Sequence, residues 1–467
     1  MKGLFIIGIF VILVAFSVNL RSVEATSSGF TSPVNISNNQ GDSILPQMAV
    51  SGNNVYVVWS DNSTGKFNIS FAKSTDGGTN FGKSIDISKG VGSSGSPQIA
   101  VVGNNVYVVW QMKTTGKYQI LFAKSTDGGA TFGNPGIISN KPGDSSYPKI
   151  STSGDNIYVA WSYTATNKDY DVLFSKSTDG GSTFSTPVNI SNNLGDSGLP
   201  QMAVSGNNVY VTWENNGLGN FEVFVAKSAD SGITFASPVN ISNNMAPSGA
   251  PQIAASGNNV YVVWMDRTPG NYDIFVAKSN DAGSTFGMPV NVSNTPKDSG
   301  YAQITASENN VYVVWTETIS NKNYDVFFAK STDGGATFGI PVNVSNNVGP
   351  SGWPLVAASN NIYVTWEDST PGNFDIFIAK STDGGSTFGA PVDVSNTPED
   401  STFKQMIATN GVVYLVWQDG SSQHETLFAK STTFVPEFGT LAPLILVVAL
   451  ISIIFYTKTM SRLKIRY

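Results

Sequence analysis

Recurring carboxylates are the residues of this chain best suited to chemistry. One set of carboxylates comes just after the tryptophan of a repeated unit. Another set begins the next β-rich segment of the same unit. Carboxylate oxygens bind cations and carbohydrate hydroxyls, and two carboxylates about 5–9 Å apart can hydrolyse a glycosidic bond. A solvated acidic surface is the alternative, because runs of charge usually serve solvation. The residues that we predict for a binding face are Asp266, Arg267, Asp273, Glu317, Asp325, Trp353, Glu367, Asp368 and Asp375.

Composition excludes several other kinds of chemistry. The 467 residues include no cysteine and one histidine, His424, so disulfides, thiolate chemistry, a histidine metal cluster and a Ser-His-Asp triad are not expected. Residues 26–434 contain 20 Lys+Arg and 31 Asp+Glu, a charge of −11. An acidic region without basic runs predicts no nucleic-acid partner. We expect no cofactor and no metal, with calcium as a weak alternative.

An eight-residue motif, S-x-D-x-G-x-T-F, occurs seven times, and we call it the aspartate turn. The first copy has Asn80 in place of threonine. Its glycine permits a turn conformation that other residues avoid, and its carboxylate can accept hydrogen bonds from backbone N–H groups of the turn. One carboxylate per turn supplies too few oxygen ligands for calcium, so a structural role is predicted. The aspartates are Asp76, Asp127, Asp179, Asp230, Asp281, Asp333 and Asp383.

The aspartate turn resembles the Asp-box of sialidase-like β-propellers, the BNR repeat. The resemblance implies that the motif joins the third and fourth strands of a blade, at the periphery. A sialidase also needs three arginines that bind the substrate carboxylate, and an Arg-Ile-Pro type motif. This chain has four arginines, only Arg267 lies in the repeats, and the Arg-Ile-Pro motif is missing. We therefore predict no sialidase activity.

The elements that must position these residues repeat with a fixed period. Each unit has four short β-rich segments separated by Gly, Asn, Asp and Pro turns, which predicts four strands. The array opens with an isolated fourth segment, residues 33–37, and closes after a third segment. We predict an all-β, single eight-bladed β-propeller over residues 32–434, closed by pairing of the N-terminal strand with the last blade. An open solenoid would leave unpaired edges. The tryptophans, spaced by 51 residues with one step of 52, are Trp59, Trp110, Trp161, Trp213, Trp264, Trp315, Trp366 and Trp417.

The two ends predict export and anchoring. Residues 1–25 read as a signal peptide, with an uncleaved anchor as the alternative. Residues 440–457 read as a transmembrane segment and 458–467 as a basic cytoplasmic tail. With the Pro-Glu-Phe-Gly of residues 435–439, this end resembles the PEF-type sorting signals of archaeal surface proteins. The expected location is the cell surface, with the propeller extracellular, monomeric and attached to the membrane.

Seven asparagines lie in N-x-S/T sequons and are candidates for glycosylation on an exported protein. A role in strand packing or in a turn is the equal alternative. They are Asn35, Asn62, Asn68, Asn189, Asn240, Asn291 and Asn343.

Amide and aromatic residues extend the candidate face. An aromatic carbohydrate platform needs rings exposed in links, and Trp353, Tyr147, Tyr301 and Phe403 suit that. The predicted role is a binding or structural surface module for a glycan, a cation or a protein. The alternatives are a non-sialidase glycoside hydrolase and a purely architectural protein. A glutamine ring expected at the channel mouth, interrupted by Lys149 and Leu355, comprises Gln47, Gln98, Gln201, Gln252, Gln303 and Gln405.

Overall fold

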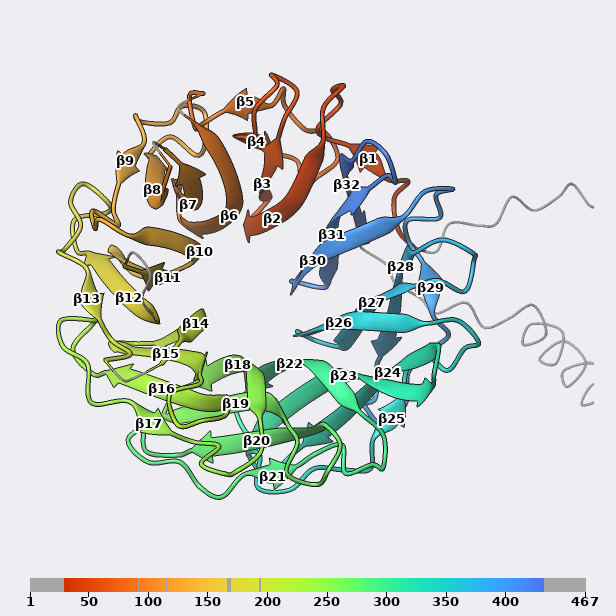
Figure 1. Ribbon diagram of the computed structural model, residues 1–467. Helices are drawn as coiled ribbons and strands as arrows, with labels where there is room; N and C mark the ends of the chain where they lie inside the picture. Colours follow the sequence, from red (N-terminus) through yellow and green to blue (C-terminus); the bar gives the residue numbers. More distant parts are fainter. Residues whose placement is uncertain (1–28, 91, 115, 166–168, 193–194, 432–467) are drawn as a thin grey trace, which may run out of the picture.

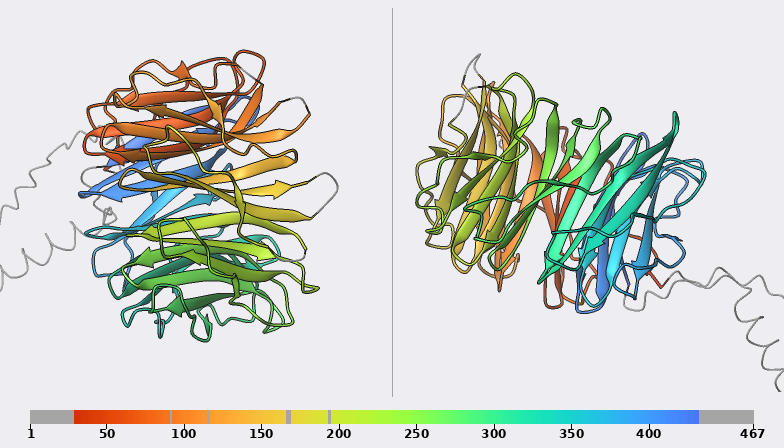
Figure 2. Two further views of the ribbon diagram at one scale, coloured as in Figure 1. Left: turned by 90° about the vertical axis from the view of Figure 1, so that its left-hand side faces the viewer. Right: turned by 90° about the horizontal axis from the view of Figure 1, so that it is seen from below.

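Eight four-stranded antiparallel sheets form a closed ring in the computed structural model, which describes residues 29–90, 92–114, 116–165, 169–192 and 195–431 (Figure 1). The predicted eight-bladed β-propeller is therefore confirmed. The blades stand side by side around a common axis in the two views of Figure 2. Within the described residues, no helix is long and apolar enough to cross a membrane. The predicted segments 1–25, 435–439, 440–457 and 458–467 lie outside these residues.

Four strand positions repeat in each blade from the channel outward. The innermost strands are β2 (Ser43–Ser51), β6 (Ser93–Val102), β10 (Asp144–Ser153), β14 (Ser197–Ser205), β18 (Ser248–Ser256), β22 (Ser299–Ser307), β26 (Ser351–Ala358) and β30 (Ser401–Thr409). The second strands are β3 (Asn54–Asp61), β7 (Asn105–Lys113), β11 (Asn156–Thr164), β15 (Asn208–Asn215), β19 (Asn259–Asp266), β23 (Asn310–Ser320), β27 (Ile362–Asp368) and β31 (Val412–Asp419). The third are β4 (Asn68–Ser74), β8 (Tyr118–Ser125), β12 (Tyr170–Ser177), β16 (Glu222–Ser228), β20 (Asp273–Ser279), β24 (Asn323–Ser331), β28 (Asp375–Ser381) and β32 (Glu425–Ser431).

The outermost strands are much shorter than the sequence pattern predicts. They are β1 (Val34–Asn35), β5 (Ile85–Asp86), β9 (Gly136–Ile137), β13 (Val188–Asn189), β17 (Val239–Asn240), β21 (Val290–Asn291), β25 (Val342–Asn343) and β29 (Val392–Asp393). Pairing stops after two residues because the last residue often turns the chain. Asn343, for example, accepts a hydrogen bond through its side-chain oxygen from the backbone N–H of Asn346 at 2.9 Å.

The core lies between blades rather than within one blade. The second strands are buried almost throughout, and all eight of their tryptophans are fully buried. Tyr56 of blade 1 packs in one cluster with Val108 and Trp110 of blade 2. β-Branched and aromatic side chains favour such strands because they fill the space between two pleated surfaces.

Each aspartate turn is a joint with the preceding blade. In blade 2, Asp127 Oδ1 accepts from the Thr131 N–H at 2.9 Å, and Ser125 Oγ donates to Asp127 at 2.6 Å. Lys73 of blade 1 donates to the Gly128 carbonyl at 2.6 Å, and Phe71 meets Phe132 edge to face at 4.9 Å. The motif therefore fastens neighbouring blades as well as turning the chain.

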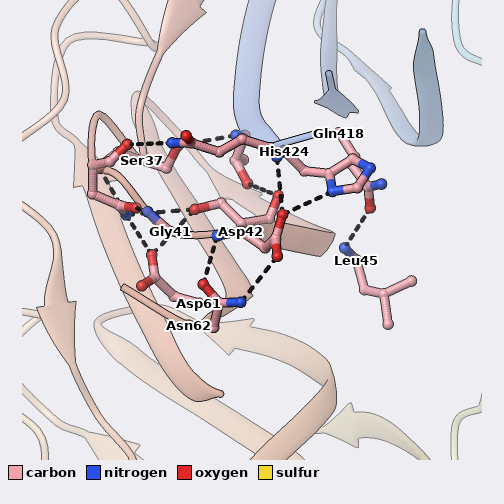
Figure 3. Close-up of polar contacts among 12 residues, drawn as sticks. Ser37, Gly41, Asp42, Leu45, Asp61, Asn62, Gln418 and His424 are labelled. Atoms are coloured by element: carbon pink, nitrogen blue, oxygen red, sulfur yellow. Dashed lines mark hydrogen bonds and ion pairs between the residues drawn. The ribbon is translucent and has the colours of Figure 1, made fainter. Parts of the chain in front are cut away.

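Blade 8 is completed by the N-terminal strand. β1 pairs with β32 through Val34 with Phe428 and Asn35 with Leu427. The joint with blade 1 contains the single histidine, because Asp42 Oδ1 lies 3.0 Å from His424 Nδ1 (Figure 3). The hydrogen bond with His424 lowers the pKa of Asp42. The predicted ring closure is confirmed.

Candidate functional site

Every innermost strand bulges at the same position. In blade 7, Gly352 pairs with Glu367 and Leu355 with Thr365, so Trp353 and its neighbour together oppose one residue of β27. The first bulged residue has a positive φ between 50° and 54° in every blade, although none of the eight is glycine. Such a conformation is unusual for a bulky residue and signals a constraint imposed by the surroundings. The eight residues are Leu45, Ser96, Tyr147, Leu199, Ala250, Tyr301, Trp353 and Phe403.

The constraint comes from the preceding blade. At six of the eight bulges, the residue directly after the repeated tryptophan of one blade accepts a hydrogen bond from the bulged N–H of the next blade. Glu367 accepts from Phe403 N–H at 2.9 Å. Glu214 accepts in the same way from Ala250 at 3.0 Å. These bonds fix the bulged backbone, so the side chains of this position form an ordered set around the channel mouth.

A cavity of about 530 Å³ lies at the mouth, bordered by blades 5 to 8 and blade 1. Three successive bulged aromatic residues border it, Tyr301, Trp353 and Phe403, and they are 56, 47 and 57% exposed. The Tyr301 and Trp353 ring centroids lie 5.7 Å apart, and Phe374 meets Trp353 edge to face at 6.1 Å. The innermost strands contribute Gln47, Gln252, Gln303, Leu355 and Gln405 to the lining.

A buried ion pair supports the aromatic edge of the cavity. Lys404 Nζ lies 3.4 Å from Glu367 Oε1 and donates to the Trp353 carbonyl at 2.6 Å. Burial lowers the pKa of Lys404, and Glu367 opposes that effect. Because Glu367 also holds the Phe403 N–H, this pair fixes Trp353 and Phe403 together. Sequence reasoning missed Lys404; the available signal was that six other blades carry proline at this position.

All seven predicted carboxylates are buried and hydrogen-bonded, which makes a solvated acidic surface the wrong interpretation for them. Asp266 and Asp368 accept from the indole N–H groups of Trp264 and Trp366 at 3.0 and 2.8 Å, and Glu317 accepts from Trp315 at 3.3 Å. In these three blades, the carboxylate two residues after the tryptophan supplies the acceptor that a buried indole N–H needs.

The carboxylates at the starts of the third strands bind the outermost strand. Asp273 and Asp325 accept from the side-chain amides of Asn291 and Asn343, each at 2.7 Å, and Asp375 accepts from Ser395 at 2.8 Å. The first two contacts bind the edge strand into its blade, and the third holds the chain just after β29.

The surroundings set the pKa values of these carboxylates in opposite directions. Burial raises the pKa of Glu317, Asp325 and Asp375. Burial acts on Asp266 in the same sense, but hydrogen bonds from Thr268 and Trp264 bring the pKa of Asp266 below its usual value.

Of the predicted binding residues, Trp353 and Glu367 line the cavity at the channel mouth. Arg267 instead lies over the Tyr272 ring at 5.7 Å. Glu367 is the one carboxylate in the lining, and it is already paired with Lys404. Hydrolysis by two carboxylates needs a second one across the cleft. Among the residues that the structure describes, no group of three or more His, Asp or Glu side chains could hold a metal ion.

The predicted turn and sequon residues lie elsewhere. Hydrogen bonds from Ser125 and Thr131 hold the pKa of Asp127 well below its usual range, and the other six turn aspartates are lowered likewise. Asn68 is buried, and Asn62 donates its amide to Asp42 at 2.9 Å. The five other sequon asparagines end outermost strands. Asp393 occupies the same position in blade 7 and accepts the same turn hydrogen bond, which favours the turn role for this position.

Comparison with protein-family models finds no match. Comparison with curated proteins finds none either. Solved structures similar to the chain include a polysaccharide lyase at 12% identity and a TM-score of 0.48, covering 89% of this chain and 94% of its own. A Hadza microbial sialidase is 14% identical with a TM-score of 0.43, over 81% of this chain and 74% of its own. The intramolecular trans-sialidase from Ruminococcus gnavus is 12% identical with a TM-score of 0.42, over 73% and 95%.

Proposed function

We propose that this chain is an exported, membrane-anchored surface protein whose Asp-box propeller binds carbohydrate in the cavity at the channel mouth. The observation that carries the proposal is the set of three exposed aromatic residues, Tyr301, Trp353 and Phe403, held in strained backbone conformations around that cavity. Exposed aromatic surface at strained positions marks a binding site more often than a packing site.

The lining has the chemistry that a sugar needs. Ring faces pack against the apolar side of a pyranose, and side-chain amides donate to and accept from its hydroxyls. Gln252, Gln303 and Gln405 supply those amides beside the aromatic residues. The paired charges of Lys404 and Glu367 neutralise each other, so the lining offers no free cation for an acidic sugar.

Binding of the full-length chain in detergent to a glycan array, with calcium and with a chelator, tests this proposal. We expect binding that does not depend on calcium and that falls at least tenfold in Trp353→Ala. The matched control is Tyr324→Ala, since Tyr324 is 40% exposed but does not line the cavity. Absence of binding under both conditions would sink the proposal, and a strict calcium requirement would favour a cation site.

The proposed location rests on sequence: the apolar run at the N-terminus, the apolar segment 440–457 and the basic residues that follow it. Similarity of residues 435–439 to PEF-type signals supports an archaeal surface anchor. Cell fractionation should find the full chain with membranes and a chain lacking residues 435–467 in the medium. Membrane retention of the shortened chain would contradict the anchor.

A further inference from the structure

A second cavity, of about 240 Å³, lies at the bulged residues of blades 3 and 4. Its lining repeats the aromatic and glutamate positions of the first cavity, although it includes none of the glutamines. Tyr147 and Leu199 are the bulged residues, 53 and 47% exposed. Phe221 directly precedes the third strand of blade 4, as Phe374 does in blade 7. Glu214 and Glu367 each follow the tryptophan of their blade and line the two cavities.

The two cavities adjoin each other. Glu214 lines the second cavity and accepts the N–H of Ala250 at 3.0 Å, and Ala250 lines the first. Ala250, which lies between them, has the smallest side chain of the eight bulged residues. The bulged residues of blades 3 to 8 thus form a continuous arc: Tyr147, Leu199, Ala250, Tyr301, Trp353 and Phe403.

We propose that the ligand is an uncharged polysaccharide chain that lies along this arc and contacts both cavities. This inference rests on the proposed carbohydrate function and specifies its ligand. A packing role would place large side chains at all eight bulges, but blade 2 has Ser96 and blade 5 has Ala250. A polymer of identical sugar units can place one unit against the aromatic residues of each cavity, whereas a short sugar can occupy only one cavity.

Charge favours a neutral polymer. The second cavity is lined by Asp196 and Glu214 without a lysine or arginine, and in the first cavity the one cation is paired with Glu367. A polyanionic chain would meet carboxylates without a compensating cation, which costs binding energy.

Neutral oligosaccharides of graded length, from the cello-, manno- and xylo- series, test the inference by calorimetry on the full-length chain in detergent. We expect affinity to rise with length, because the second contact becomes intramolecular. In the variant Tyr147→Ala/Phe221→Ala, the ratio of long-chain to short-chain affinity should fall about tenfold. In Trp353→Ala/Phe403→Ala, the affinities for short and long chains should fall together.

The outcomes separate the two proposals. If the first double variant leaves that ratio unchanged while the second still weakens binding, the polymer inference is wrong and the carbohydrate function stands. If none of the three series binds, or if Trp353→Ala/Phe403→Ala has no effect, the carbohydrate function itself fails. Unchanged melting temperatures, and retention of the ratio in Tyr147→Phe, exclude a general loss of structure.

Discussion

At the scale of single residues, blade 7 places two aspartates next to each other where the end of its outermost strand meets the start of its third strand. Five blades have asparagine there, and in blades 5 and 6 that amide donates to the aspartate that begins the third strand. Blade 7 places Asp393 beside Asp375 instead. Burial and the neighbouring Asp375 raise the pKa of Asp393 to about 6. Asp375 accepts hydrogen bonds from Ser395 and Thr397, which favour its charged form. Asp393 is therefore the residue of this pair that takes up a proton first.

Asp393→Asn should therefore stabilise the protein at neutral pH. The pKa of this carboxyl is higher in the folded than in the unfolded protein. Its ionisation therefore lowers the free energy of unfolding as the pH rises from about 4 to 6, and the loss remains above pH 6. Allowing for solvent screening, we expect a gain of roughly 1–2 kcal/mol in the free energy of unfolding at pH 7. At pH 4 the variant and the parent should differ little. Chemical denaturation at both pH values measures this, and an equal effect at both would refute the protonation argument.

The Lys404–Glu367 pair offers a second residue-scale prediction. Glu367→Gln retains an acceptor for the Phe403 N–H but leaves the Lys404 cation buried without its partner. We expect a loss of about 3–5 kcal/mol in the free energy of unfolding, and recovery of most of it in Glu367→Gln/Lys404→Met. Glu214→Gln is the matched control, because Glu214 holds Ala250 in the same way and has no lysine partner. A large loss in that control would show that replacing a charged acceptor by a neutral one, rather than breaking the ion pair, causes the effect.

At the scale of elements, the aspartate turn has two positive-φ positions with different neighbours. The first is Ser231 in blade 4 and Ala282 in blade 5, so it tolerates a side chain. The second is glycine in all seven turns. A Cβ on Gly129 would lie 2.5 Å from the Phe71 ring of the preceding blade. The consensus glycine is thus required by the neighbouring blade as well as by the backbone.

Gly129→Ala should destabilise the protein more than Gly103→Ala. Both glycines have positive φ, but nothing lies within 4 Å of a Cβ on Gly103. The control should lose about 1–2 kcal/mol for the left-handed conformation. Gly129→Ala should lose a further 1–3 kcal/mol from overpacking against Phe71. Urea unfolding of the two variants compares them, and equal losses would mean that the blade contact contributes nothing.

At the scale of the whole molecule, the ring depends on contacts between its two ends. β1 pairs with β32, Phe30 bridges to Ser431, and Lys430 donates to Thr79 of blade 1 at 2.7 Å. Phe428 meets Phe81 edge to face at 4.9 Å, so the closing joint repeats the geometry of the other blade joints.

A chain that begins after Ser37 should lose this closure. Without β1, strand β32 has an unpaired edge, which favours association with another chain. We expect the melting temperature to fall by at least about 5 °C and dimers or larger species to form with rising concentration. A chain that begins at Gly29 is the control. Calorimetry and sedimentation measure both effects, and an unchanged monomer would show that closure is dispensable.

Local and periodic features were readable from the sequence alone. Blade number, strand order, the turn motif and the closing strand follow from a fixed period and from residues such as Gly129 and Asp127, whose roles depend on near neighbours. Trp353 was also predictable as an exposed aromatic residue because it breaks the repeat. The two-residue length of the outermost strands was not predictable, because a side-chain hydrogen bond ends these strands.

Only the tertiary structure decided which polar residues face solvent. The sequence suggests exposed carboxylates at Asp266, Asp368 and Asp375, but the structure buries all three against tryptophans or beside an edge strand. The spacing of residues in the sequence cannot show this burial. The bulges, the Lys404–Glu367 pair and both cavities arise where one blade meets the next. The physical reason is that a repeat specifies its own strands, whereas the space between adjacent repeats depends on side chains about fifty residues apart.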